Sequence, residues 1–226
     1  MNPSPIATPV PPEIFRLAID PAAPLVIVDV DEVLAMFMRG FERFVAVRGL
    51  EMRIDRFALF ENIFRPGDAQ HLDVADGRAL FDTFFETDVE AIDPAPGASE
   101  ALAALASRAG VVVLTNAPGH SRAGRARWLE RHGFPYPLIV NSGRKGPAVA
   151  ALAARTAGAV AFVDDLLPNL ESVALAAPAV HRFQMVADER LASLAFAAPE
   201  RHRRIDDWPT LHRAIAGALG LGGLGG

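Results

Sequence analysis

The sequence predicts an α/β protein, a doubly wound parallel sheet with a Rossmann-like core and an inserted helical cap. Short apolar runs alternate with segments of helical spacing along most of the chain. Three of these runs are apolar without a break, as expected of parallel strands covered on both faces. One long interval interrupts the alternation. With 226 residues, 51% of them hydrophobic, the chain can bury one core and still carry an insertion.

The expected elements follow one another at regular intervals. Apolar runs predict strands that begin near residues 25, 111, 137, 159 and 179. Helical spacing predicts helices between them, over 97–109, 121–132, 146–157 and 168–177. A last helix begins in "DDWPTLHRAIAGAL", where Asp207 suits the N-cap and Pro209 the first turn.

The interval over residues 33–96 predicts the helical cap. Phe37, Phe41 and Phe44 recur at helical spacing, and we expect them to form the buried side of a cap helix more than a substrate wall. The chain returns to the core through "DPAPG", whose prolines and glycine predict a turn. The core domain is therefore expected to comprise residues 25–32 and 97–220.

Both ends of the chain are expected to lie outside the folded core. Residues 1–24 are rich in proline, which disfavours helix, so they predict an extended arm. Glycine dominates the end of the chain, and residues 221–226 predict a tail without order of its own.

Composition and charge exclude several classes of function. A net charge of −5 and a pI near 5.7 give no bulk attraction to a nucleic acid polymer or an anionic membrane surface. No run approaches the roughly 18 apolar residues of a membrane span, and the N-terminus has no pattern of a secretory signal. The chain has no cysteine, which excludes disulfides and thiolate chemistry. We expect a cytoplasmic protein.

Polar side chains stand where the predicted strands end. In an open parallel sheet, ligands bind beyond the carboxyl ends of the strands. Two residues that are two apart on an extended segment point the same way, so Asp29 and Asp31 can face one site. The complete set of candidates is Asp29, Asp31, Thr115, Asn116, Lys145, Asp164 and Asp165.

Four of these candidates are carboxylates, and together they predict a cation. Acids that converge in a partly dry site repel one another and raise one another's pKa. Oxygen ligands without nearby His or Cys suit a hard ion such as Mg²⁺, which commonly meets a protein through one or two carboxylates and a substrate phosphate.

The candidates resemble, in order, the four motifs of the haloacid dehalogenase superfamily: "DVDEV", "LTN", Lys145 and "VDD". An insertion directly after the first motif corresponds to the C1-type cap of that superfamily. The resemblance covers residues 25–184. A single DxD is weak evidence, but the ordered set on strand ends is specific.

The resemblance implies a role for each residue. Asp29 would attack phosphorus and form an aspartyl phosphate, and Asp31 would act as the general acid and base. Thr115 and the amide of Asn116 would hold the phosphoryl oxygens, while Lys145 would offset the negative charge. The expected activity is a phosphatase acting on a small-molecule phosphate ester.

The resemblance also implies where Mg²⁺ would bind. Asp29, the backbone carbonyl of Asp31, and the Asp164/Asp165 pair would place the ion. Asp165 is the first choice because it aligns with the most regular acid of the superfamily, and Asp164 either ligates or orients.

Two positions bear on the chemistry within this superfamily. Asp31 favours phosphate transfer over dehalogenation, because the dehalogenases that share this fold lack the second Asp. Glu32 stands where the superfamily usually has Gly, at a point where the backbone turns away from the strand. A Glu there predicts an altered flap geometry or an added substrate contact.

A second resemblance concerns the substrate. The segments "FFETDVEAIDPAPGASEAL", "RWLERHGF" and "FVDDLLPNL" are similar to the 5'(3')-deoxyribonucleotidase branch, which implies a nucleoside 5'-monophosphate. Other small phosphomonoesters remain open, as do two alternative functions, a phosphomutase and a catalytically idle protein that binds a phosphorylated ligand. The sequence identifies neither the substrate nor the number of subunits.

Overall fold

The core of the protein is a six-stranded sheet in which every neighbouring pair of strands is parallel. The computed structural model describes residues 9–222. The strand order is β5-β4-β1-β6-β7-β8, which confirms the expected fold class. The strands are β1 (Leu25–Val28), β4 (Gly110–Thr115), β5 (Leu138–Val140), β6 (Val160–Asp164), β7 (His181–Gln184) and β8 (Arg203–Arg204).

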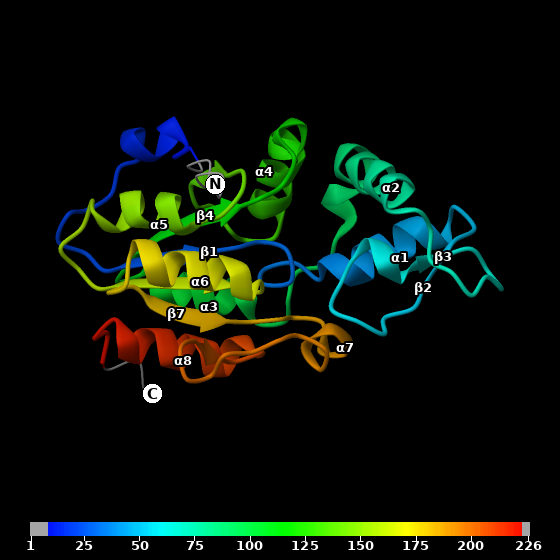
Figure 1. Ribbon diagram of the computed structural model, residues 1–226. Helices are drawn as coiled ribbons and strands as arrows, with labels where there is room; N and C mark the ends of the chain where they lie inside the picture. Colours follow the sequence, from blue (N-terminus) through cyan, green and yellow to red (C-terminus); the bar gives the residue numbers. More distant parts are fainter. Residues whose placement is uncertain (1–8, 223–226) are drawn as a thin grey trace, which may run out of the picture.

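Helices cover both faces of this sheet (Figure 1). Leu25 and Ile27 of β1 pack into one apolar cluster with α5 and α6, whereas Val26 and Val28 pack into the opposite cluster with α3 and α8. Both side-chain directions of β1 are therefore buried, which explains the unbroken apolar run. The helices of the core are α3 (Ala98–Ala106), α4 (Arg122–Arg131), α5 (Gly146–Ala153), α6 (Leu167–Ala176), α7 (Glu189–Ala192) and α8 (Trp208–Ala218).

Residues 33–96, the interval expected to form the cap, contribute no strand to the six-stranded sheet, and their helices lie on the side toward which β7 points (Figure 1). We call this segment the insertion. Its phenylalanines pack together as expected: Phe41, Phe44 and Phe84 are buried and lie in edge or stacked contact. A short antiparallel hairpin, which helical spacing did not predict, joins the helices. The elements are α1 (Phe37–Ala46), β2 (Glu51–Met52), η2 (Phe60–Asn62), β3 (Ile63–Phe64), α2 (Val74–Thr87) and η3 (Val89–Ala91).

Two tryptophans fasten the insertion to the core. The outgoing and returning segments run antiparallel, with Ala95 N–H donating to Leu34 O at 2.7 Å. Trp208 at the start of α8 donates from Nε1 to Val33 O at 2.9 Å, and Trp128 of α4 donates to Ile92 O at 2.7 Å. These are the two tryptophans of the sequence, and both are fully buried. Each therefore fixes one of the two segments that connect the insertion.

The expectation of an extended N-terminal arm is wrong for its second half. Residues Pro12–Arg16 form a 3-10 turn, η1, and Ile14 is buried against the α5 and α6 face. Arg155 donates to Leu17 O at 2.7 Å and also to Ile14 O. The arm remains attached because an apolar side chain and a guanidinium hold it. Residues 1–8 of the expected arm lie outside the described residues.

The expectation for the C-terminal tail is wrong at its start. Leu221 is buried in the core, and its carbonyl accepts from Arg108 Nη1 at 2.7 Å. Residues 223–226 of the expected tail lie outside the described residues. Across residues 9–222, no helix has the length and apolar character that a membrane crossing requires.

Replacing Trp208 by Phe should lower the free energy of unfolding by about 1–3 kcal/mol, because the buried Val33 carbonyl loses its donor. Denaturant titration followed by circular dichroism measures this loss. Phe196→Leu is the control, because this aromatic side chain is 79% exposed and should be neutral. A change of less than about 0.5 kcal/mol for Trp208→Phe would contradict the anchoring role.

Candidate active site

A buried ammonium group lies at the base of the site. Lys145 precedes α5, and its Nζ lies 2.7 Å from Asp29 Oδ1 and 2.7 Å from Asp164 Oδ2. The lysine side chain is fully buried. Burial alone would lower the pKa of Lys145, yet the two carboxylates raise it above its ordinary value, so the ammonium stays charged. The Lys145 ammonium therefore links the end of β1 to the end of β6 through its ion pairs with Asp29 and Asp164.

Close packing of α5 against α6 gives Lys145 its position. A side chain at Gly146 would collide with the backbone and hydroxyl of Ser172 on α6. The Gly146 N–H donates to Ser172 Oγ at 3.1 Å, which fixes the first turn of α5. The sequence "RKGP" thus combines the lysine with the one residue type that permits this approach.

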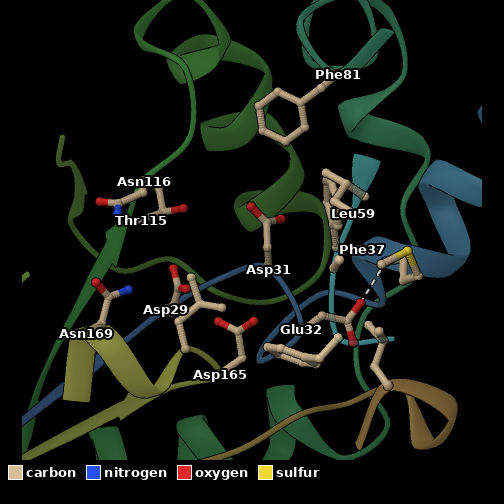
Figure 2. Close-up of a pocket in the computed structure, with 15 residues that line it drawn as sticks. Asp29, Asp31, Glu32, Phe37, Leu59, Phe81, Thr115, Asn116, Asp165 and Asn169 are labelled. Atoms are coloured by element: carbon tan, nitrogen blue, oxygen red, sulfur yellow. Dashed lines mark hydrogen bonds between the residues drawn. The ribbon is translucent and has the colours of Figure 1, made fainter. Parts of the chain in front are cut away.

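Five of the seven candidates line one cavity of about 300 Å³ (Figure 2), and the other two lie next to it. Lys145 and Asp164 lie behind its floor, where they contact each other and Asp29. The candidates that line it directly are Asp29, Asp31, Thr115, Asn116 and Asp165. The opposite wall comes from the insertion, through Phe37, Met38, Phe57, Leu59 and Phe81.

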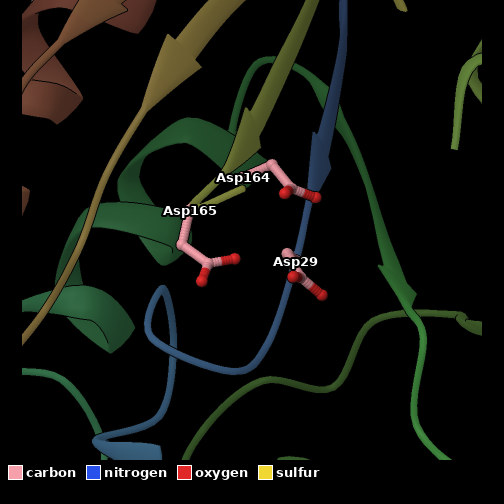
Figure 3. Close-up of side chains that lie close together, drawn as sticks. All are labelled: Asp29, Asp164 and Asp165. Carbon is pink, nitrogen blue, oxygen red and sulfur yellow. The ribbon is translucent and has the colours of Figure 1, made fainter. Parts of the chain in front are cut away.

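Three aspartates form a compact acidic cluster (Figure 3): each of Asp29, Asp164 and Asp165 offers an oxygen within 4.8 Å of the others. Burial raises the pKa of Asp164 to about 6 and that of Asp165 well above its ordinary value, and the neighbouring acids add to both shifts. Lys145 offsets part of this negative charge, and a bound cation would relieve the repulsion that remains.

The three acids of this cluster differ in their hydrogen bonds: Asp164 is held by several donors, whereas Asp29 and Asp165 are available to a cation. Asp164 accepts from Lys145, from Leu166 N–H at 2.9 Å and from Asn169 Nδ2 at 3.0 Å. Within residues 9–222, the Asp165 carboxylate accepts no hydrogen bond. Asp29 and Asp165 therefore fit a hard divalent cation best, with Asp164 orienting Lys145.

Asp31 stands apart from the acidic cluster and points into the cavity (Figure 2). Arg125 of α4 donates from Nη2 to Asp31 Oδ1 at 2.6 Å. Burial raises the pKa of Asp31, and the Arg125 guanidinium opposes that rise. The arginine is fully buried, with its charged group 5.2 Å from the Phe85 ring centroid. Its contact holds the Asp31 carboxyl group in one orientation.

Sequence reasoning missed Arg125 as a site residue. A signal exists in "RARWLER", because Arg125 precedes Trp128 and Leu129 at the spacing of one helix face. Both of these are buried, which places the arginine on the buried side of α4. An arginine on the apolar face of a helix calls for an acidic partner.

The end of β4 provides polar groups opposite the acids. Thr115 Oγ1 is buried and has no hydrogen-bond partner among the described residues. Asn116 is held in place, since its Nδ2 donates to Gly143 O at 2.9 Å and its Oδ1 accepts from Asn141 at 2.8 Å. The Thr115 hydroxyl is therefore free to bond to a polar ligand at this end of the cavity.

Glu32 adopts the left-handed backbone conformation, with a φ of 57°. The chain does turn away from the strand at this position, as expected from the usual glycine. Its carboxylate accepts from Met38 N–H at 2.7 Å and from Asp188 N–H at 2.9 Å. Burial raises the pKa of Glu32 to about 7, although both N–H groups oppose that rise. Glu32 thus joins the first turn of α1 to the N-cap of α7.

Solved structures are similar to this chain in fold. The protein YfnB from Bacillus subtilis, described as a HAD-hydrolase and determined with magnesium, has a TM-score of 0.60 and 14% identity, covering 86% of this chain and 99% of its own. A haloacid dehalogenase-like hydrolase from Streptococcus pneumoniae has a TM-score of 0.57 and 12% identity, covering 86% and 98%. The chain has the haloacid dehalogenase-like fold.

The names of the similar structures do not agree on one activity. A protein from Thermotoga maritima described as a beta-phosphoglucomutase matches the haloacid dehalogenase-like fold of this chain with a TM-score of 0.51 and 17% identity, covering 86% of this chain and 99% of its own. No protein-family model and no curated protein matches the sequence. The reaction must therefore be argued from the site.

Asp165→Asn should stabilise the metal-free protein above neutral pH. Because the pKa of Asp165 is raised on folding, stability falls as pH rises from the ordinary carboxyl range through that raised pKa. At about pH 8, calorimetry should give the variant a melting temperature higher by about 3 °C or more, and at about pH 5 the difference should shrink.

Adding Mg²⁺ tests whether the effect of Asp165→Asn comes from a cation site or only from the loss of one negative charge. Excess Mg²⁺ should raise the melting temperature of the parent protein, and should raise that of Asp165→Asn less. Asp68→Asn, which removes an exposed acid, is the matched control. Equal stabilisation of both variants by Mg²⁺ would contradict a cation site at Asp165.

Glu32→Gln should destabilise the protein although it preserves size. The amide group must turn its own N–H₂ toward either the Met38 or the Asp188 N–H, which leaves one buried donor without an acceptor. We expect a loss of about 1–3 kcal/mol in the free energy of unfolding, measured by urea titration. Glu189→Gln is the control, and an equal effect of both substitutions would refute the bridging role.

Proposed function

We propose that this chain is a Mg²⁺-dependent phosphatase that hydrolyses a small phosphomonoester through an aspartyl phosphate on Asp29. The observation that supports it most is the buried Lys145 ammonium, which holds Asp29 from behind at the floor of the cavity. An ammonium in that position offsets the negative charge of the Asp29 carboxylate and orients it toward a substrate. Positioning and electrostatics are what phosphoryl transfer requires of a protein.

Asp29, Asp165 and the backbone carbonyl of Asp31 would hold the proposed cation. When bound, Mg²⁺ supplies positive charge that offsets the phosphate oxygens and the acidic cluster. Asp164 orients Lys145 and completes the charge balance. The three carboxylates of the cluster, with the ammonium, leave a net negative site that suits a divalent ion.

Asp29 and Asp31 divide the proposed chemistry. An Asp29 oxygen attacks phosphorus, and the bond from phosphorus to the alcohol oxygen breaks as Asp31 donates its proton to that oxygen. Asp31 then accepts a proton from the water that attacks the phosphoryl group, which releases phosphate and restores Asp29. The raised pKa of Asp31 favours the protonated form needed for the first step. Arg125 positions this carboxyl group.

Thr115 and Asn116 hold the phosphoryl group in this proposal. The unpaired Thr115 hydroxyl can donate to a phosphoryl oxygen, as can the backbone N–H of Asn116. Binding energy there places phosphorus in line with the attacking carboxylate. A nucleoside 5'-monophosphate is one candidate ester, because aromatic side chains of the insertion face the site.

Turnover of p-nitrophenyl phosphate should require Mg²⁺ and should fall roughly a thousandfold or more in Asp29→Asn, because the amide cannot form the covalent intermediate. Steady-state assays with and without a chelator measure both effects. Asp68→Asn should retain full activity. Retained activity in Asp29→Asn would contradict the proposed mechanism.

The alternative functions give different results in the same assay. A phosphomutase would deliver the phosphoryl group to a second substrate, so the product would be a new ester instead of inorganic phosphate. A catalytically idle protein would bind phosphate esters saturably without turning over any member of a broad panel.

A further inference from the structure

The cavity has two chemically different ends (Figure 2). The core contributes acids and amides from the ends of the strands. The insertion and α7 contribute a wall that carries no polar side chain: Phe37, Met38, Phe57, Leu59, Phe81 and Leu191. A phosphate bound at the acidic end therefore directs the alcohol portion of the ester toward apolar and aromatic carbon.

The lining of the cavity offers no positive charge to a second acidic group of the ligand, as far as residues 9–222 show. Of the described residues that line the cavity, none is Lys or Arg. Arg39, on the first helix of the insertion, pairs with Glu189 at 2.5 Å. Arg78 lies in a neighbouring cavity beyond Phe81, which Asp82 also lines. A carboxylate or second phosphate on the alcohol portion would therefore lie against apolar carbon without a counter-ion in the cavity lining.

Outside the groups assigned to the phosphate and the cation, the polar side chains of the lining already make hydrogen bonds within the protein. Both oxygens of Glu32 accept backbone N–H groups. The Asn169 amide donates to Asp164, and the Asn116 amide donates to Gly143 O. A sugar-like ligand would bury hydroxyls against the insertion without partners, at a cost that an apolar group avoids.

The apolar wall is held in a defined shape. Asn62 is fully buried, and its Nδ2 donates to Arg56 O at 3.0 Å and to Ala58 O at 2.8 Å. These bonds fix the loop that carries Phe57 and Leu59. Glu32 fixes the adjoining turn of α1. A wall that is fixed in advance selects ligands by shape and polarity.

We infer that the substrate is the phosphate ester of an uncharged, apolar alcohol, with an aryl group as the best match. The inference deepens the proposed phosphatase function and rests on it. An aryl ring gains from contact with Phe37, Phe57 and Phe81, and buries apolar surface against Leu59.

The test compares two esters that differ by one charge. Phenyl phosphate and 4-carboxyphenyl phosphate share the reacting group and have leaving groups of similar basicity, so any difference reports on the wall. With Mg²⁺ present, we expect kcat/KM for phenyl phosphate to exceed that for 4-carboxyphenyl phosphate by about a hundredfold. Glycerol 1-phosphate and nucleoside 5'-monophosphates should lie below phenyl phosphate.

Variants of Leu59 test whether the apolar wall of the cavity causes the preference for phenyl phosphate. Leu59→Ala should reduce kcat/KM for phenyl phosphate about tenfold, mainly through KM, and leave glycerol 1-phosphate within about twofold. Leu59→Arg supplies the missing cation and should narrow the preference for phenyl over 4-carboxyphenyl phosphate by about tenfold or more. Leu175→Ala, at an 87% exposed position on α6, is the matched control and should change neither ester.

The possible outcomes test the phosphatase function and the apolar substrate class separately. Discrimination against the carboxylate, reduced by Leu59→Arg, supports the apolar substrate class. Turnover of both phenyl esters at equal efficiency, or a preference for glycerol 1-phosphate or nucleotides, overturns that class while the phosphatase stands. Absence of Mg²⁺-dependent turnover with every ester overturns the phosphatase function and the substrate class with it.

Discussion

The Lys145 ammonium is the charge on which the rest of the site depends. It is fully buried, and its energetic cost is offset only because Asp29 and Asp164 both lie 2.7 Å away. Those two acids stand at the ends of neighbouring central strands, so the ion pairs join β1 to β6 at the point where ligands bind in this architecture. Removing the charge would leave a buried cluster of acids with no protein counter-ion.

The two walls of the cavity have separate origins in the fold. The acidic floor follows from the parallel sheet, because the strands end side by side. The apolar wall follows from the insertion, which Trp128 and Trp208 attach to the core and Glu32 joins to α7. In the proposed function, the floor would determine which reaction is feasible and the wall would determine which alcohol is accepted. A change in the insertion can thus alter the substrate without altering the chemistry.

The sequence predicts the floor much better than the wall. Strand ends and the spacing of Asp29 and Asp31 are local features, and the parallel sheet brings them together with few alternatives. The unusual backbone at Glu32 also follows from one position in a motif. The contacts of the Glu32 carboxylate cannot be predicted in this way, because its partner Asp188 lies 156 residues further along the chain. Arg125 was missed for the same reason, since its partner Asp31 comes from a different element.

Trapping the covalent intermediate would test the central claim most directly. Borohydride reduces an aspartyl phosphate to homoserine, which mass spectrometry locates within a peptide. With Mg²⁺ and phenyl phosphate in a rapidly quenched reaction, the account predicts this conversion at Asp29 alone, and none when Mg²⁺ is chelated. Conversion at another carboxylate, or steady turnover with no modified residue, would contradict it.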